Sequence, residues 1–120
     1  MRAALIGLAI SAAFAAIPAQ AQDAAQVASV AISQGAYSDA ERTLQQELRV
    51  HPGRPELMLN LAAVYARTGR AADARTLYNR VLTQEEVLMD LSADRTAGSH
   101  AVARTGLRRL EPVQYTARAN

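Results

Sequence analysis

Two segments of this chain match each other at a fixed distance along the sequence. The first, GAYSDAERTLQQEL, begins at Gly35, and the second, GRAADARTLYNRVL, begins at Gly69, 34 residues later. The same shift places Asp73 on Asp39. A repeat of this period is typical of chains in which each unit is stable only when it is stacked on its neighbours. The repeat therefore constrains the fold more than any other feature of the sequence.

The spacing of apolar residues predicts that each unit is a pair of helices. In the second unit, the first helix has an apolar face made by Leu57, Leu61, Val64 and Tyr65. Pro55 suits the first turn of that helix, where its missing N–H is not needed, and Gly69 suits the left-handed turn that ends it. The following helix has an apolar face made by Ala74, Leu77, Tyr78, Val81 and Leu82.

Small residues mark the points where the two helices of each unit are expected to cross. Ala62 and Ala74 take these positions in the second unit, and Ala28 and Ala40 take them in the first. A larger side chain at such a crossing would separate the helices. The stretch 51–53, His-Pro-Gly, is expected to break the chain between the units, since proline cannot continue a helix.

This pattern resembles the tetratricopeptide repeat family over about residues 24–86, although Ala31 and Glu86 depart from the residues that the family prefers there. The resemblance implies an all-α fold of two helical hairpins, about 22–52 and 55–86, which form a fragment of an α-solenoid. It also implies packing roles for Val27, Ala28, Gly35, Ala40, Leu44, Leu61, Ala62, Tyr65, Gly69, Ala74, Tyr78 and Leu82.

The family resemblance further implies a concave groove, lined by the first helix of each pair, that binds a peptide or a partner helix. The matching residues of the second unit are Glu56, Leu59, Asn60, Ala63, Ala66 and Arg67. The first unit contributes Ala25, Ala28, Ser29 and Ile32. Leu59 lies away from the apolar face of its helix, so it is either part of the groove or an incidental exposed leucine.

Residues after the repeat are expected to cover the outer face of the second unit, because two units alone are too few for a stable solenoid. Residues 87–98 are either a short β-hairpin or a helix extension. Ser99 is a candidate N-cap for a helix over 99–110. Its buried stripe is expected to be Val102, Ala103, Gly106, Leu107 and Leu110. Residues 111–120 are expected to form a loose tail.

Residues 1–21 have the three parts of a secretory signal peptide: a charged start, an apolar middle and a small-residue cleavage site that ends at Ala21. We expect export, most simply to a bacterial periplasm, with secretion as the alternative. The apolar run is short for a membrane span. The chain has no cysteine, which excludes disulfides and a cysteine-linked lipid anchor.

Charge and motifs argue against several classes of function. After signal removal, twelve arginines would face eleven carboxylates, so the net charge of +1 gives little support to nucleic-acid binding. No metal-ligand or phosphate-loop pattern is present, and Ser99 with His100 does not make a credible nucleophile and base. We therefore expect no enzyme, no metal and no cofactor. The sequence favours a protein-binding module, with a unit that stacks on itself or on a larger repeat protein as the alternative.

Overall fold

The computed structural model describes residues 19–92 and 95–112. They form four helices, a two-stranded hairpin and a final helix, so the predicted all-helical class with a hairpin before the last helix is confirmed. The elements in chain order are α1 (Ala19–Ser33), α2 (Tyr37–Val50), α3 (Pro55–Arg67), α4 (Ala71–Leu82), β1 (Leu88–Ser92), β2 (Arg95–Gly98) and α5 (Ser99–Leu110).

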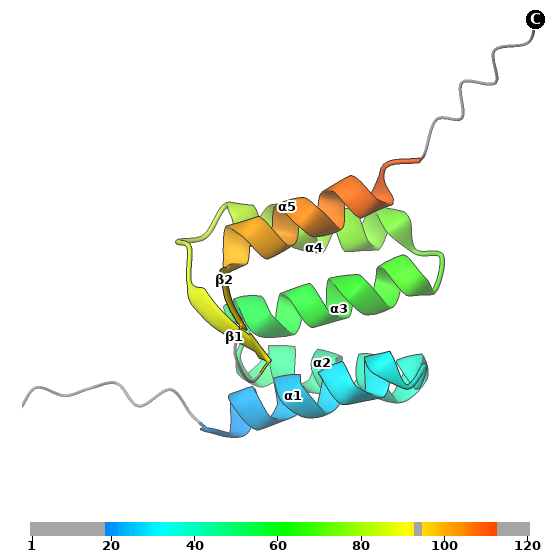
Figure 1. Ribbon diagram of the computed structural model, residues 1–120. Helices are drawn as coiled ribbons and strands as arrows, with labels where there is room; N and C mark the ends of the chain where they lie inside the picture. Colours follow the sequence, from blue (N-terminus) through cyan, green and yellow to red (C-terminus); the bar gives the residue numbers. More distant parts are fainter. Residues whose placement is uncertain (1–18, 93–94, 113–120) are drawn as a thin grey trace, which may run out of the picture.

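The helices lie in two layers. Figure 1 shows α1, α3 and α5 side by side in the nearer layer, with α2 and α4 behind them. Each of the first two pairs is an antiparallel hairpin, and the pairs stack through contacts of α3 with both α1 and α2. The final helix α5 packs against α3 and α4, in the place where the first helix of a third pair would stand.

The two repeated glycines make the same turn in both units. Gly35 and Gly69 each have a φ of 79°, which is the left-handed conformation expected of a helix-ending glycine. The residue after each glycine donates a 2.8 Å backbone hydrogen bond back across the turn, from Ala36 to Ala31 O and from Arg70 to Tyr65 O. This pairing closes the helix end in the manner of a Schellman motif.

The small residues predicted at the helix crossings are fully buried. Ala28 and Ala40 lie in a first core cluster between the two units, and Ala62 and Ala74 lie in a second cluster beneath α5. Pro55 is in the first turn of α3, as expected. Close helix packing at alanines, with large apolar residues between them, therefore holds both pairs together.

A partly exposed ion pair also joins the two units. The guanidinium of Arg70, at the start of α4, donates two 2.7 Å hydrogen bonds to the carboxylate of Glu41 in α2, and its carbon lies 4.4 Å from the centre of the Tyr65 ring. The hydrogen bonds from Arg70 hold the pKa of Glu41 below its usual value, while partial burial opposes this shift. The pair links the two units through side chains on different helices.

Residues 87–98 form the hairpin, not a helix extension. Strands β1 and β2 are antiparallel, and the pairing shifts register between Asp90 and Ser92. Met89 is the buried residue of β1, whereas Val87 and Leu91 have 40% and 43% of their surfaces exposed. The shift in pairing after Asp90 interrupts the two-residue alternation of the strand before Leu91.

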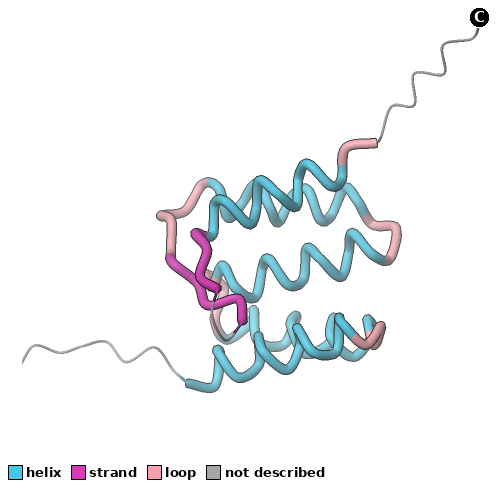
Figure 2. The backbone as a smooth tube through the Cα atoms, in the orientation of Figure 1, coloured by secondary structure: helices cyan, strands magenta, loops and turns pink. Residues whose placement is uncertain are grey.

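Ser99 has a different role from the predicted N-cap. The cap position is Gly98, and its helix has no side-chain cap hydrogen bond. Ser99 is the first helical residue and is fully buried; its Oγ accepts a 3.0 Å hydrogen bond from Val87 N, and its own N–H donates to Val87 O at 2.8 Å. Ser99 therefore closes the base of the hairpin. Figure 2 shows this hairpin at one end of the helical layers.

The closing helix α5 has the predicted bounds and the predicted apolar face. Ala103 is buried in the second core cluster, and Val102, Leu107 and Leu110 of the predicted stripe pack partly buried against that cluster. Gly106 lies against the ring of Tyr78, because a Cβ added at Gly106 would come within 2.7 Å of Tyr78 Cε2. A close helix contact thus explains a glycine inside this helix.

Two parts of the predicted segments lie outside the described residues. They are residues 1–18 of the predicted signal peptide (1–21) and residues 113–120 of the predicted tail (111–120). The helix α1 begins at Ala19, ahead of the predicted cleavage point after Ala21. Within residues 19–92 and 95–112, no helix has the length and apolar character needed to cross a lipid bilayer.

Candidate partner-binding surface

The exposed side of the nearer layer is the candidate site, because it is the surface that the first helices of the pairs present. On α3, four of the six predicted groove residues, at spacings of four, three and four, share one helix face. They are Glu56, Asn60, Ala63 and Arg67. Arg67 is exposed and the other three are half-buried, so a partner can reach this stripe.

The other two predicted groove residues, Leu59 and Ala66, belong to the core. Leu59 has only 6% of its surface exposed and lies in the second core cluster, and Ala66 packs against that cluster. The 34-residue shift explains this, since it places Leu59 on Ala25, which is buried under the second unit. In the second unit, α5 and the hairpin cover the face of α3 that contains Leu59. Leu59 is therefore neither an open groove residue nor an exposed leucine, and both expectations are wrong.

Two residues of the stripe bind α1. The Asn60 amide nitrogen donates a 3.0 Å hydrogen bond to Ala25 O, and Arg67 Nη1 donates a 3.4 Å hydrogen bond to Ile32 O. Each bond joins residues 35 apart, so the two bonds run in parallel along the α1–α3 contact. They orient both side chains on the surface and satisfy backbone carbonyls of α1. Asn60 and Arg67 therefore have a structural role in addition to any binding role.

The first unit contributes less to the surface than expected. Ala25, Ala28 and Ile32 are buried in the first core cluster, while Ser29 is exposed. Val27, expected to pack between repeats, is 63% exposed. Its equivalent, Leu61, is buried because the first unit covers it, and no described element covers Val27 in the same way. The packing role predicted for Val27 is thus wrong for this chain.

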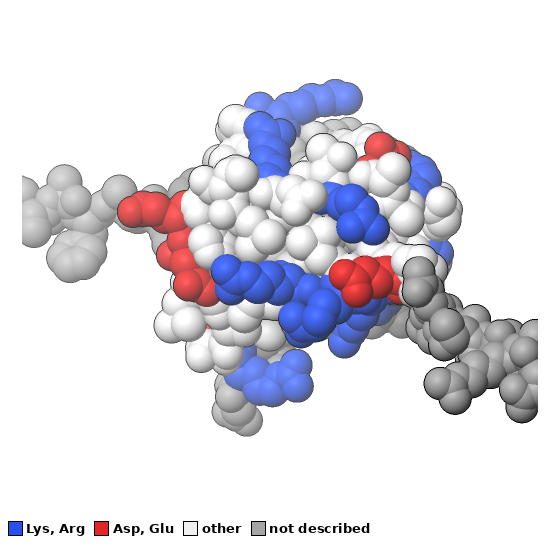
Figure 3. All heavy atoms as spheres, turned by 90° about the horizontal axis from the view of Figure 1, so that it is seen from above, with Lys and Arg blue, Asp and Glu red and all other residues white. Residues whose placement is uncertain are grey.

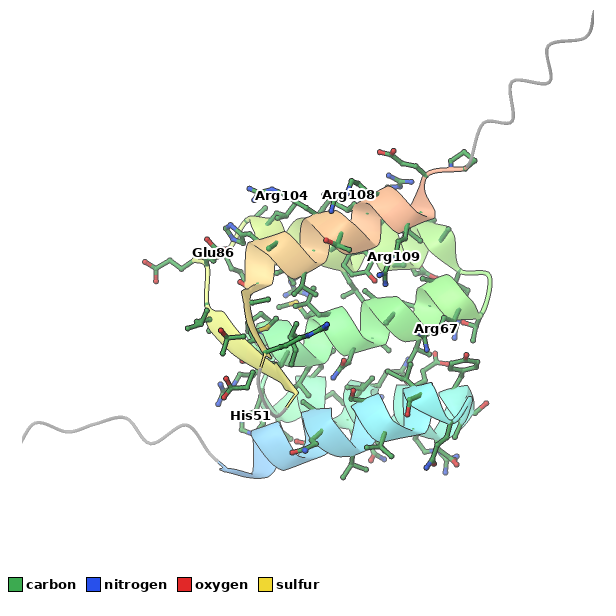
Figure 4. The ribbon with its side chains drawn as sticks, in the orientation of Figure 1. His51, Arg67, Glu86, Arg104, Arg108 and Arg109 are labelled. Atoms are coloured by element: carbon green, nitrogen blue, oxygen red, sulfur yellow. The ribbon has the colours of Figure 1, made fainter. Side chains whose placement is uncertain are left out.

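The structure adds Arg109 of α5 to the candidate site. Figure 4 shows its side chain extending from α5 towards α3, while Arg104 and Arg108 lie on the outer side of α5. Burial raises the pKa of Tyr78, and the positive charges of Arg109 and Arg67 act in the opposite direction. The sequence places Arg109 in a basic helix but does not show which way it points.

Ser99 and His100, the residues considered for catalysis, form hydrogen bonds with the backbone of the segment that precedes the hairpin. Ser99 Oγ is bonded to the Val87 N–H, and His100 Nε2 donates a 2.7 Å hydrogen bond to Gln84 O. Because a carbonyl can only accept, this bond places the His100 proton on Nε2. Ser99 is also fully buried. In the described part of the chain, no three His, Asp or Glu side chains are grouped as metal ligands would be.

Comparison with known proteins agrees with this architecture. A family model described as tetratricopeptide repeat matches residues 27–86, which is half of the chain. The matched region begins within α1 and ends after α4, so it covers both helical pairs. No curated protein and no solved structure matches the chain. The chain belongs to the tetratricopeptide repeat family, whose domains mediate protein–protein interactions and are typically scaffolds without enzymatic activity.

Proposed function

We propose that this protein is an exported interaction module that binds a segment of a partner protein on its concave face. The observation that carries the proposal is the open stripe of Glu56, Asn60, Ala63 and Arg67 along α3. Its central residue, Ala63, is small and leaves room for an incoming backbone, while the residues around it can hydrogen-bond or form ion pairs. Such a surface, with a polar rim and few large side chains, suits an extended or helical segment.

The charge at one end of this surface favours a partner segment with an acidic residue. Arg67 of α3 and Arg109 of α5 come from neighbouring helices of the nearer layer (Figure 4), and both side chains are exposed. Two guanidinium groups can bind one carboxylate with several charge-assisted hydrogen bonds. Arg67 is also oriented by its bond to Ile32 O, which reduces the conformational entropy lost on binding.

Export is part of the proposal and is supported by the sequence of residues 1–21. A periplasmic location fits a short, alanine-rich signal, and secretion from the cell is the alternative. Expression of the whole chain followed by fractionation and N-terminal sequencing tests this. Mature protein that begins at Gln22 in the periplasmic fraction supports the proposal, and an uncleaved chain in the cytoplasm contradicts it.

Binding is tested by affinity capture from an envelope fraction, followed by mass spectrometry. We expect Arg67→Glu with Arg109→Glu to abolish capture of the main partner while the helical circular dichroism spectrum is unchanged. The matched control is Arg75→Glu, which removes an exposed arginine from α4 in the other layer. Capture that survives the double substitution, or that Arg75→Glu reduces equally, places the site elsewhere.

The self-stacking alternative is favoured by a separate observation, the exposed apolar surface of α1. Val27 and Val30 of this surface lie outside the α3 stripe and outside the core. The two surfaces are therefore compatible in one molecule.

A further inference from the structure

The outward side of α1 is an unpartnered apolar face. An open hollow on it is lined by Gln26, Val27, Val30, Ala31 and Gln34. Val27 and Val30 have 63% and 50% of their surfaces exposed. Exposed valines at helical spacing around a hollow are unusual on a solvated helix face.

The 34-residue repeat indicates what kind of element would pack against this face of α1. A shift of 34 residues places Val27 on Leu61 and Val30 on Val64, whose exposed fractions are 4% and 0%. Leu61 and Val64 are buried because the first unit stacks on that side of α3. The face of α1 is thus the stacking face of a repeat, and none of the described residues covers it as the first unit covers α3.

We propose that a second copy of this chain covers the face, with the α1 helices antiparallel across a two-fold axis. Residues 24–38 contain no charged side chain, so two such faces meet without repulsion or loss of ion hydration. Head-to-tail stacking is disfavoured because the opposite end of the molecule is α5, whose outer side carries the exposed Arg104 and Arg108 (Figure 4). Figure 3, which views the molecule from above, shows basic side chains spread over this end. An isologous contact through α1 brings residues 24–33 of the two copies together, and none of these residues is charged.

The residue pattern also suits an antiparallel register. With the axis between Val30 and Ala31, each Val30 lies opposite Ala31 of the other copy, and each Val27 lies opposite Gln34. A large residue then faces a small one at the centre, which lets the helices approach closely. One helix per copy covers less than the roughly 800 Å² per partner of a standard interface, so we expect a weak dimer with a Kd on the order of micromolar.

The proposal does not depend on partner binding by the α3 stripe, and its test does not involve that surface. Analytical ultracentrifugation of the purified protein should show a monomer–dimer equilibrium that shifts with concentration. Val27→Glu with Val30→Glu should give a monomer at every concentration and an unchanged helical spectrum. The matched control is Val50→Glu, another exposed valine at 70% exposure in α2, which should dimerise as the wild type does.

Because the chain has no cysteine, a single introduced cysteine reports contacts without background. Val30→Cys should form a disulfide-linked dimer under mild oxidation, whereas Ala72→Cys, exposed on α4, should not. A wild-type protein that stays monomeric throughout overturns the proposal. So does cross-linking that is equally efficient at both positions, or a partner of another sequence whose capture is lost only on Val30→Glu.

Discussion

Gly106 gives a sharp test of how α5 closes the stack. In a solvated helix, replacing glycine by alanine stabilises by about 1 kcal/mol, because the unfolded chain loses backbone freedom. Here the added Cβ of Gly106→Ala would overlap the buried ring of Tyr78, 2.7 Å from Cε2. Overpacking of this kind costs about 1–3 kcal/mol. We therefore expect a net loss of about 1 kcal/mol, which for a domain of this size lowers the melting temperature by about 4–8 °C.

The sign of the effect should reverse when the ring is removed. In a Tyr78→Leu background, Gly106→Ala should stabilise by about 1 kcal/mol, because only the helix preference remains. Ala101→Gly, at an exposed position of the same helix, calibrates that preference and should destabilise by about 1 kcal/mol. Chemical denaturation measures the wild type and the four variants. A Gly106→Ala protein more stable than the wild type would refute the packing of α5 on Tyr78.

Two further predictions concern the links between elements. Ser99→Ala removes the acceptor of the Val87 N–H, so we expect a loss of about 1–2 kcal/mol and faster amide hydrogen exchange at Val87, with Ser38→Ala as an exposed control. Glu41→Gln weakens the pair with Arg70. Since the pKa of Glu41 is lower when folded, its stabilisation is present above the usual value of 4.5 and is lost as the pH falls through the lowered pKa. The wild type should therefore melt higher than Glu41→Gln at neutral pH, and the two should converge in acid; a difference that persists at low pH would contradict this.

The repeat was sufficient to predict most of the fold because each unit carries its own local signals. The turn glycines, Pro55 and the crossing alanines act within one helical pair, so their effects do not depend on distant residues. Gly106 could be assigned to the buried stripe of its helix from its spacing, although Tyr78 of α4 could not be named as its neighbour. The hairpin was predicted as one of two alternatives, since an alternating run of five residues fits either structure.

The candidate site was harder to predict, because it depends on what covers each helix face. Leu59 is on the face that a third repeat would cover, and the sequence after Leu82 does not repeat a third time. Comparison of Leu59 with Ala25 across the 34-residue shift was the available signal. Val27 shows the reverse case. It is an apolar residue at a position where the repeat packs, but none of the described residues covers it. The direction of Arg109 follows only from the placement of α5 in the nearer layer.

The most direct test of the account is removal of α5, since the central claim is that this helix replaces a third repeat. A chain that ends at Gly98 should expose the second core cluster, including Met58, Tyr78 and Val81. We expect it to aggregate or to lose cooperative thermal unfolding, while a control chain that ends at Pro112 unfolds as the full chain does. If the chain that ends at Gly98 instead melts with the same cooperativity and at the same temperature as the full chain, α5 does not close the stack.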